Sequence, residues 1–298
     1  MSDERHIRDP EDLPALYQAA NARSLSAQTS FLFWYRARLF GLLLAAAGGA
    51  LAHPIWGISI GGWLAVAAFT AALVSELVVA ILKPDKTWYE GRAAAESAKT
   101  LSWRFMTSGA KDGAGQSDTE AQTEFLAELK DLLHDLGDLE LATTGSGDTQ
   151  ITKAMNVARR ADFPTRKALY KSCRIEDQRL WYEGKAAWNA RRWRQWTAAT
   201  VAAEGVGVIV GLLVAVGTIR FDALAIVAAI AATMTAWVQA KQHQNLSTAY
   251  SIASQEIAAI KSEIDLIDES KWAEFVAQSE EAISREHTLW RASKGAKL

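Results

Sequence analysis

The sequence has only one cysteine, Cys173, so the chain cannot form an internal disulfide, and its cysteine usage does not indicate an oxidising compartment. It also lacks an excess of charge, because the formal net charge is −2. A strongly basic balance is typical of nucleic-acid-binding proteins, so we expect no nucleic-acid partner. The first residues are polar and acidic rather than apolar, and we therefore expect no cleavable signal peptide.

Residue arrangements typical of metal sites and active sites are missing as well. The five histidines are scattered without the spacing of metal ligands. No serine–histidine–acid group and no paired carboxylates stand out. Two glycine-containing stretches, at 111–118 and 143–148, lack the Gly-Lys-Ser/Thr ending of a P-loop, and we interpret them as connectors. The sequence therefore predicts a protein with no metal, no cofactor and no enzymatic activity.

Charge is nearly missing from two long stretches of the chain. Residues 39–82 contain one charged side chain, that of Glu76. Residues 195–240 contain only the charged side chains of Glu204, Arg220 and Asp222. A membrane-spanning helix needs about 20 apolar residues, so each stretch is long enough for two such helices and a turn. A hairpin buried in a soluble protein is the alternative, but two stretches of this length and purity are the usual membrane signal.

Helix-breaking residues divide both stretches. Pro54 and Gly57 interrupt the first one at residues 53–59, and the second is interrupted at residues 217–222. The predicted membrane spans lie at about 39–56, 60–82, 196–216 and 223–240. The predicted fold class is thus an all-α integral membrane protein with two transmembrane helical hairpins and long cytoplasmic helical or coiled-coil extensions.

Basic residues mark the same end of every predicted span. Lysine and arginine beside a span favour the cytoplasmic side, and the two turns contain only Arg220, which has Asp222 nearby. We therefore expect a multi-pass protein of the bacterial inner membrane with both termini and the central segment in the cytoplasm. The flanking basic residues are Arg36, Arg38, Lys83, Lys86, Arg92, Arg191, Arg192, Arg194 and Lys241.

The charged parts of the chain have helical patterns. After the fourth span, apolar residues recur at alternating spacings of four and three, which predicts a coiled-coil seam that is either intramolecular or between subunits. The seam consists of Leu246, Tyr250, Ala253, Ile257, Ile260, Ile264 and Ile267. Before the third span, Phe163-Pro164-Thr165 is typical of a helix start, and one continuous helix is predicted over 166–216.

Spans and loops divide the chain into three predicted parts. These are a first two-span unit at 1–110, a cytoplasmic connector with short helices at 111–163, and a second two-span unit with the C-terminal coiled-coil helix at 164–298. One segment recurs, as Trp-Tyr-Glu-Gly-Arg-Ala-Ala at 88–94 and Trp-Tyr-Glu-Gly-Lys-Ala-Ala at 181–187. Because the first copy follows a hairpin and the second precedes one, we interpret them as amphipathic juxtamembrane helices, with a shared docking surface as the alternative.

Two acidic residues lie inside predicted spans. At 1.5 Å per helical residue, Glu76 and Glu204 are about 10 Å below the cytoplasmic surface. Acids at this depth are costly and usually face a bundle interior or water, so one interpretation is a polar belt that lines or gates a cation path. Alternatively, each acid stays protonated within one subunit or reaches toward Lys83 or Arg194. The threonines near the same depth are Thr200, Thr233 and Thr235.

Small residues in the spans point to close helix contacts. Gly207 and Gly211 form a small-xxx-small pair, which packs helices either within one subunit or between subunits. Together with the isoleucine-rich seam, this pair predicts a homo-oligomer in the lipid bilayer.

Two segments resemble a known family. WYEGRAAAESAKTLSWR at 88–104 is similar to the segment after the hairpin in one subfamily of SLATT domains, the two-transmembrane effector domains associated with SMODS nucleotidyltransferases and SLOG sensors. RIEDQRLWY at 174–182, followed by KAAWN at 185–189, is similar to the segment before the hairpin in another subfamily. The chain thus resembles a tandem of two such domains over nearly its whole length.

The resemblance implies a pore-forming or membrane-disrupting effector of a nucleotide-linked antiphage or conflict system. It also implies a switch by a separately encoded partner that makes or senses a nucleotide, since neither kind of domain is recognisable in this sequence. The alternatives are a membrane-anchored coiled-coil scaffold that recruits a cytosolic partner, and a constitutive ion-channel subunit. Toxic expression with loss of membrane potential would favour the effector, and harmless capture of a partner would favour the scaffold.

Overall fold

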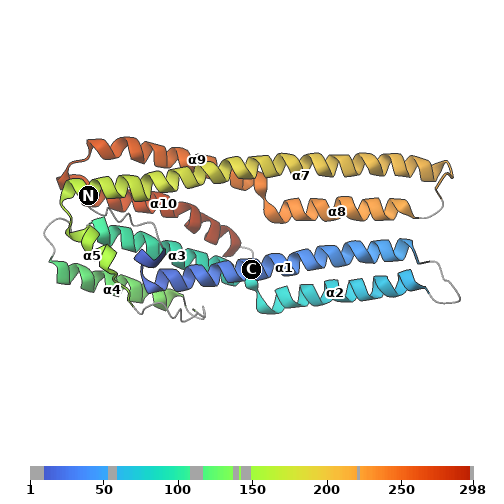
Figure 1. The fold of residues 1–298 in the computed structure, drawn as a ribbon, viewed down its shortest axis with the longest axis horizontal. Helices are drawn as coiled ribbons and strands as arrows, with labels where there is room; N and C mark the ends of the chain where they lie inside the picture. Colours follow the sequence, from blue (N-terminus) through green and yellow to red (C-terminus); the bar gives the residue numbers. More distant parts are fainter. Residues whose placement is uncertain are drawn as a thin grey trace, which may run out of the picture. The chain divides into compact units, whose positions relative to one another are not determined.

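The computed structural model describes residues 10–52, 59–107, 117–136, 141, 149–219 and 222–295, with side chains described between residues 11 and 284 of these ranges. Every regular element in them is a helix (Figure 1). In chain order they are η1 (Pro10–Asp12), α1 (Ala15–Ala50), α2 (Ile60–Leu82), α3 (Pro84–Thr107), α4 (Asp118–Asp135), α5 (Lys153–Arg160), α6 (Phe163–Leu169), the π-helix η2 (Tyr170–Glu176), α7 (Asp177–Ala215), α8 (Ala223–Lys241), α9 (His243–Glu263), η3 (Ile264–Leu266), η4 (Glu269–Lys271) and α10 (Trp272–Gly295).

Four helical segments are long and apolar enough to cross a membrane. They are Ala15–Ala50, Ile60–Leu82, Phe163–Ala215 and Ala223–Leu266. Parts of the predicted turns and connectors lie outside the described residues, namely 53–58, 108–116, 137–140, 142–148, 220 and 221. The described chain is therefore an all-helical protein with four long apolar helices.

Side-chain caps fix where several helices begin. Ser59 accepts a hydrogen bond from the backbone of the first turn of α2, and Asp222 does the same for α8. At α4, Ser117 and Glu120 form a reciprocal capping box, in which each side chain accepts a hydrogen bond from the other residue's backbone N–H. Because the first N–H groups of a helix have no partner within it, these caps determine the start of each helix.

The two apolar helices α2 and α8 end in the same way. Each is followed by one residue in the left-handed conformation, Lys83 (φ 43°) after α2 and Gln242 (φ 48°) after α8. The next helix begins at the following residue, Pro84 or His243. A single left-handed residue that is not glycine therefore separates each pair of consecutive helices.

The chain divides into two compact units, described here separately. The polar unit comprises the described residues within 1–27, 86–184 and 250–298, and the apolar unit comprises those within 28–85 and 185–249. Helices α1, α3, α7 and α9 contribute residues to both units.

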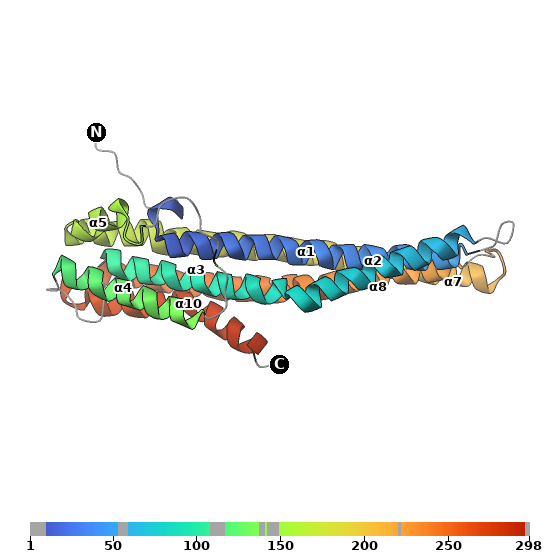
Figure 2. The same ribbon diagram turned by 90° about the horizontal axis from the view of Figure 1, so that it is seen from below.

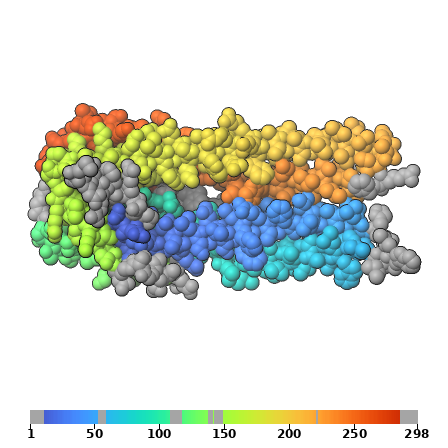
Figure 3. Space-filling model, viewed as in Figure 1, coloured from blue at the N-terminus to red at the C-terminus, as the bar shows by residue number. Residues whose placement is uncertain are grey.

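In the apolar unit, α1 packs closely along α2. A Cβ atom added at Gly48 would lie 2.7 Å from the Gly61 carbonyl oxygen, and one added at Gly41 would lie 2.9 Å from the Ala68 carbonyl oxygen. The space-filling view shows α1 in contact with α2 here (Figure 3). The lack of side chains at these positions lets the two backbones touch, as small residues do in membrane helix pairs.

The polar unit has an aromatic and aliphatic core. Helices α3, α4 and α10 run alongside one another in it (Figures 1 and 2). The Trp272 indole N–H donates to the Thr107 carbonyl oxygen at 2.9 Å, which joins α10 to the end of α3. The largest buried apolar side chains of this core include Trp103, Phe105, Met106, Phe125, Met155, Tyr170, Ile257, Ile264, Trp272, Phe275 and Val276.

Two predicted helices differ in detail from the structure. The continuous helix predicted over 166–216 contains a π-helical segment, η2, between α6 and α7. The seam is predicted up to Ile267, but α9 ends before its last two residues. Helix α9 ends at Glu263, Ile264 starts a 3-10 turn and Ile267 is extended. In both cases tertiary packing changes the helical period, since Arg174 and Ile264 are fully buried at these points.

Candidate membrane-embedded site

The first predicted intramembrane acid is paired with a cation. Nη1 of Arg38 on α1 lies 2.5 Å from Oε2 of Glu76 on α2, and the two side chains are 41% and 48% exposed. The partner of Glu76 is thus Arg38 rather than Lys83 or Arg194, the two cations expected from the sequence. The register of the helix pair gives the signal, because Gly48 lies opposite Ala65 and Gly41 opposite Ala72, so continuation of this register brings residue 76 to residue 38.

The second predicted intramembrane acid has no such partner. Glu204 on α7 is exposed, and no described residue makes a hydrogen bond or an ion pair with it. One turn earlier, the Thr200 hydroxyl is buried and has no hydrogen-bond partner in the described part of the chain. Because residues four apart lie on one face of a helix, Thr200 and Glu204 form a polar patch on α7.

The two other threonines of the predicted belt lie apart from each other. Thr233 and Thr235 on α8 are half-buried. Two residues span about 200° around an α-helix of 3.6 residues per turn, so these side chains leave nearly opposite sides of α8. At most one of them can therefore face the Thr200–Glu204 patch on α7.

The predicted glycine pair lies between α7 and α8. A Cβ atom added at Gly207 would be 3.5 Å from a Val227 methyl group, and one added at Gly211 would be 3.9 Å from a Leu224 methyl group. These are ordinary van der Waals distances, so α7 and α8 pack less closely than α1 and α2.

The predicted seam packs inside the chain. Ile257 and Ile264 are buried in the core of the polar unit, and Tyr250, Ile260 and Ile267 lie partly buried against that core. The Tyr250 ring contacts the rings of Trp181 and Tyr182, with centroid distances of 5.6 Å for both. Leu246, in the apolar unit, is half-buried.

Aromatic and basic side chains gather at one end of the apolar helices. The Trp237 ring on α8 has the Tyr35 and Trp196 rings at 6.3 Å, and the Tyr35 hydroxyl donates to the Ala236 carbonyl oxygen at 3.1 Å. The Arg36 guanidinium and the Lys241 ammonium each lie 5.2 Å from the Trp237 centroid. The sequence identifies the two cations only as charges that flank separate spans, because they are far apart in the chain.

A buried polar contact lies beside this end of α8. His243 Nδ1 is 2.7 Å from Asn189 Oδ1, and Asn189 Nδ2 donates to the Lys185 carbonyl oxygen at 2.8 Å. The second bond fixes the amide orientation, so Nδ1 of His243 is the donor in the first. Burial, together with the positive charges of Lys241 and Arg192, lowers the pKa of His243. The imidazole is therefore neutral at pH 7.

A buried ion pair in the polar unit joins the π-helix to α10. Arg174 donates from Nε to Glu280 Oε1 at 2.8 Å and from Nη2 to Oε2 at 2.6 Å, and the Tyr170 hydroxyl donates to Oε1 at 3.0 Å. Burial alone would lower the pKa of Arg174, but the attraction and hydrogen bonds of Glu280 outweigh it and raise this pKa. Burial and the Glu280 charge raise the pKa of Tyr170 well above its ordinary value.

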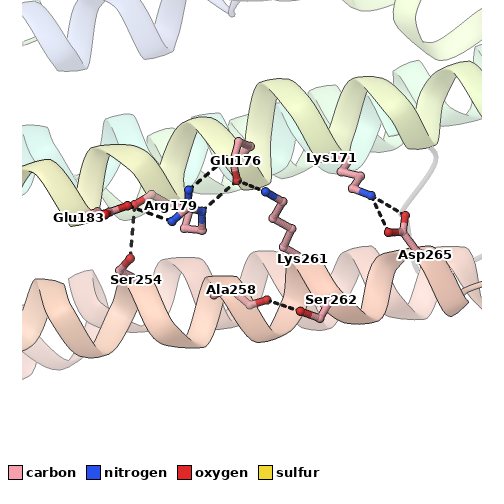
Figure 4. Close-up of polar contacts among 9 residues, drawn as sticks. All are labelled: Lys171, Glu176, Arg179, Glu183, Ser254, Ala258, Lys261, Ser262 and Asp265. Atoms are coloured by element: carbon pink, nitrogen blue, oxygen red, sulfur yellow. Dashed lines mark hydrogen bonds and ion pairs between the residues drawn. The ribbon is translucent and has the colours of Figure 1, made fainter.

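Surface ion pairs tie the region around η2 and α7 to α9 and η3 (Figure 4). Lys171 contacts both carboxylate oxygens of Asp265 at 2.6 Å, and Lys261 lies 2.7 Å from Glu176. Arg179 bonds to Glu176 at 2.9 Å. The hydrogen bonds from Arg179 and Lys261 lower the pKa of Glu176 to about 2.

The fold and these contacts define a class of protein, namely an α-helical membrane protein with a second, charged helical unit. Within the described residues, no three His, Cys, Asp or Glu side chains lie close enough together to hold a metal ion. The family model described as SMODS and SLOG-associating 2TM effector domain 3 matches residues 14–167, and that of effector domain 1 matches residues 170–290. The chain belongs to the SMODS and SLOG-associating two-transmembrane effector (SLATT) family and contains two such domains in tandem. No curated protein and no solved structure matches it.

Proposed function

We propose that this chain is a membrane effector of a bacterial nucleotide-linked antiphage or conflict system that oligomerises in the inner membrane and permeabilises it, without catalysing a reaction. The description of both matched domains as two-transmembrane effectors supports the effector role. The four long apolar helices support action in the membrane.

The proposal of a pore rests on the Glu204 carboxylate, which is exposed and has no partner among the described residues. An unpaired acid that faces lipid near the middle of a helix costs about 3 kcal/mol. Glu76 avoids this cost through Arg38, whereas no described residue neutralises Glu204. Assembly of several chains removes the cost if the exposed Glu204 side of α7 faces a shared, water-filled interior. In this arrangement, Glu204 lines a cation path.

Ion flux during controlled expression, followed with a membrane-potential dye, tests this role. Glu204→Gln should keep the protein level and oligomeric state but slow the loss of potential, and the charge-keeping Glu204→Asp should retain it. Glu76→Gln serves as the comparison, because it leaves Arg38 unpaired and should lower the protein level, with recovery on adding Arg38→Gln. Unchanged flux in Glu204→Gln would refute the pore-lining role. An intact potential with the unmodified chain at the same membrane level would favour a scaffold.

The proposed topology has four spans with both termini in the cytoplasm. The basic residues beside all four apolar segments support it, because such residues are enriched on the cytoplasmic side. Reporter fusions after residue 107 and after residue 298 should both score as cytoplasmic. A periplasmic score at either point would refute the orientation.

The trigger in this proposal comes from a separately encoded protein that makes or senses a nucleotide. The family name associates these domains with SMODS and SLOG proteins and so supports such a partner. Expression of the chain alone should then depolarise cells less than its expression together with the neighbouring gene for such a partner. Equal depolarisation would show that the chain needs no trigger.

A further inference from the structure

Two cations meet at one indole ring in the apolar unit. Arg36 comes from α1 and Lys241 from the end of α8, and each charge lies 5.2 Å from the Trp237 centroid. The Tyr35 and Trp196 rings pack against the same indole, so side chains from α1, α7 and α8 build the cluster. The Tyr35 hydroxyl, bonded to the Ala236 carbonyl oxygen, holds α1 against α8 at this level.

These two charges lack a counterion in the described part of the chain. Neither Arg36 nor Lys241 forms an ion pair there, whereas Arg38, two residues from Arg36, is paired with Glu76. Because both charges lie 5.2 Å from one centroid, they are at most about 10 Å apart, which is close to the screening length of about 8 Å at physiological ionic strength. They therefore repel each other, and the indole attracts both without neutralising either.

The surroundings add positive charge. Arg192 on α7 lies over the Trp188 ring at 5.5 Å, and together with Lys241 it acts on buried His243. His243 stays neutral and donates to Asn189, so it neither adds to the positive charge nor offsets it. The cluster is thus a site of local positive potential that an external anion would stabilise.

The position of the cluster indicates which anion. Arg36 precedes the first apolar stretch and Lys241 follows the last, so both lie where apolar sequence gives way to charged sequence. Tryptophan and tyrosine concentrate at headgroup level in membrane proteins, and basic pockets between helices on the cytoplasmic side bind anionic headgroups. We propose that Arg36 and Lys241, on either side of Trp237, bind the phosphate of an anionic phospholipid. This site rests on the membrane topology of the proposed function.

Lipid binding by the purified full-length chain in detergent tests the site. Native mass spectrometry counts bound phosphatidylglycerol, with phosphatidylcholine as the neutral lipid. One basic residue at a membrane surface contributes about fivefold in affinity, so Arg36→Gln and Lys241→Gln should each weaken phosphatidylglycerol binding by about fivefold and the double variant by about 30-fold. Phosphatidylcholine binding should not change.

The matched control is Arg194→Gln. Arg194 is an exposed cation beside the third apolar segment, with no ion pair or ring contact in the described residues. It should leave phosphatidylglycerol binding unchanged. The charge-keeping variants Arg36→Lys and Lys241→Arg should also retain binding, which separates loss of charge from misfolding.

Three outcomes would overturn the proposal. They are wild-type affinity in the double variant, an equal loss in Arg194→Gln, and displacement of the lipid by equimolar inorganic phosphate, which would mark a site for free phosphate. The membrane-potential assay on the same variants is an independent readout. Loss of lipid binding in the Arg36 and Lys241 variants, together with unchanged flux in Glu204→Gln, shows that the pore-lining proposal fails and the lipid site stands. Wild-type lipid binding in those variants, together with slowed flux in Glu204→Gln, shows the opposite.

Discussion

Glu280→Gln should loosen the attachment of α10 to the π-helix. Arg174 and Glu280 are 1% and 0% exposed and share two hydrogen bonds, and Tyr170 donates a third to the same carboxylate. Glutamine keeps the shape and one acceptor oxygen but removes the charge. The guanidinium then stays buried without its counterion, and loss of one partner of a buried pair costs about 3–5 kcal/mol.

The structure places the expected cost at the lower end of that range. Glu96 also attracts Arg174 and remains in the variant. Nη1 of Arg174 already has no hydrogen-bond partner in the described residues, so the attraction of Glu96 reduces the cost but does not remove it. We therefore expect about 3 kcal/mol, which corresponds to about 150-fold faster amide exchange in the part of α10 that opens.

Hydrogen–deuterium exchange with mass spectrometry on the full chain in detergent measures this change peptide by peptide. The control is Glu281→Gln, because Glu281 is the exposed neighbour of Glu280 on the same helix. Adding Arg174→Met to Glu280→Gln should recover part of the protection, since the buried charge is then gone. Equal exchange in Glu280→Gln and Glu281→Gln would refute the reasoning.

Three further predictions follow from glycine packing and from one surface carboxylate. Gly48→Ala should lower the thermal unfolding midpoint in detergent by the equivalent of about 2 kcal/mol, because the new Cβ atom meets the backbone of α2. Gly49→Ala should not lower the midpoint, because a Cβ atom there has open space, and equal midpoints for the two variants would contradict this prediction. Gly91→Ala should destabilise by about 1–2 kcal/mol, and Gly184→Ala should stabilise by about 0.5–1 kcal/mol in the same assay. Because its pKa is lowered to about 2, ionised Glu176 stabilises the fold above the ordinary glutamate pKa, and this stabilisation is lost as the pH falls toward 2. Glu176→Gln should therefore lower the free energy of unfolding by about 1 kcal/mol at pH 7, and by progressively less in an acid titration below pH 4.5.

The apolar helices follow from the sequence because missing charge is a local property. A stretch such as 60–82 has too few polar side chains to make a soluble surface, and α2 covers the same residues. The π-helix could not be predicted in this way, since nothing in residues 170–176 departs from a helical pattern. Its position coincides with the buried contact of Arg174 to Glu280, which lies 106 residues away in the chain.

The contacts of the candidate site likewise include some that the sequence specifies locally and one that depends on the tertiary fold. The contact of Glu76 with Arg38 was within reach of the sequence, because an antiparallel hairpin with a turn near residue 56 brings these positions together. The helical period likewise places Thr233 and Thr235 on different sides of α8. The meeting of Arg36 and Lys241 at Trp237 requires α1 and α8 to be neighbours, which no local pattern specifies.

The repeated seven-residue segment shows how one motif serves two arrangements. At the first copy, the Ser24 hydroxyl on α1 donates to the Trp88 carbonyl oxygen at 3.1 Å, and a Cβ atom added at Gly91 would lie 3.1 Å from the Ala20 carbonyl oxygen. At the second copy, the Ser247 hydroxyl on α9 donates to the Ala186 carbonyl oxygen at 3.0 Å.

In both copies, a serine of the partner helix therefore bonds to the backbone of the motif helix. The partner helix is α1, before the hairpin, in the first domain and α9, after the hairpin, in the second. The motif therefore goes with a helix pair rather than with one side of the hairpin. Tyr182 is buried in its pair, whereas no neighbour lies within 4 Å of a Cβ added at Gly184. Close approach at the glycine thus belongs to the first pair alone. Helix packing at both copies supports the interpretation of the two segments as packed juxtamembrane helices.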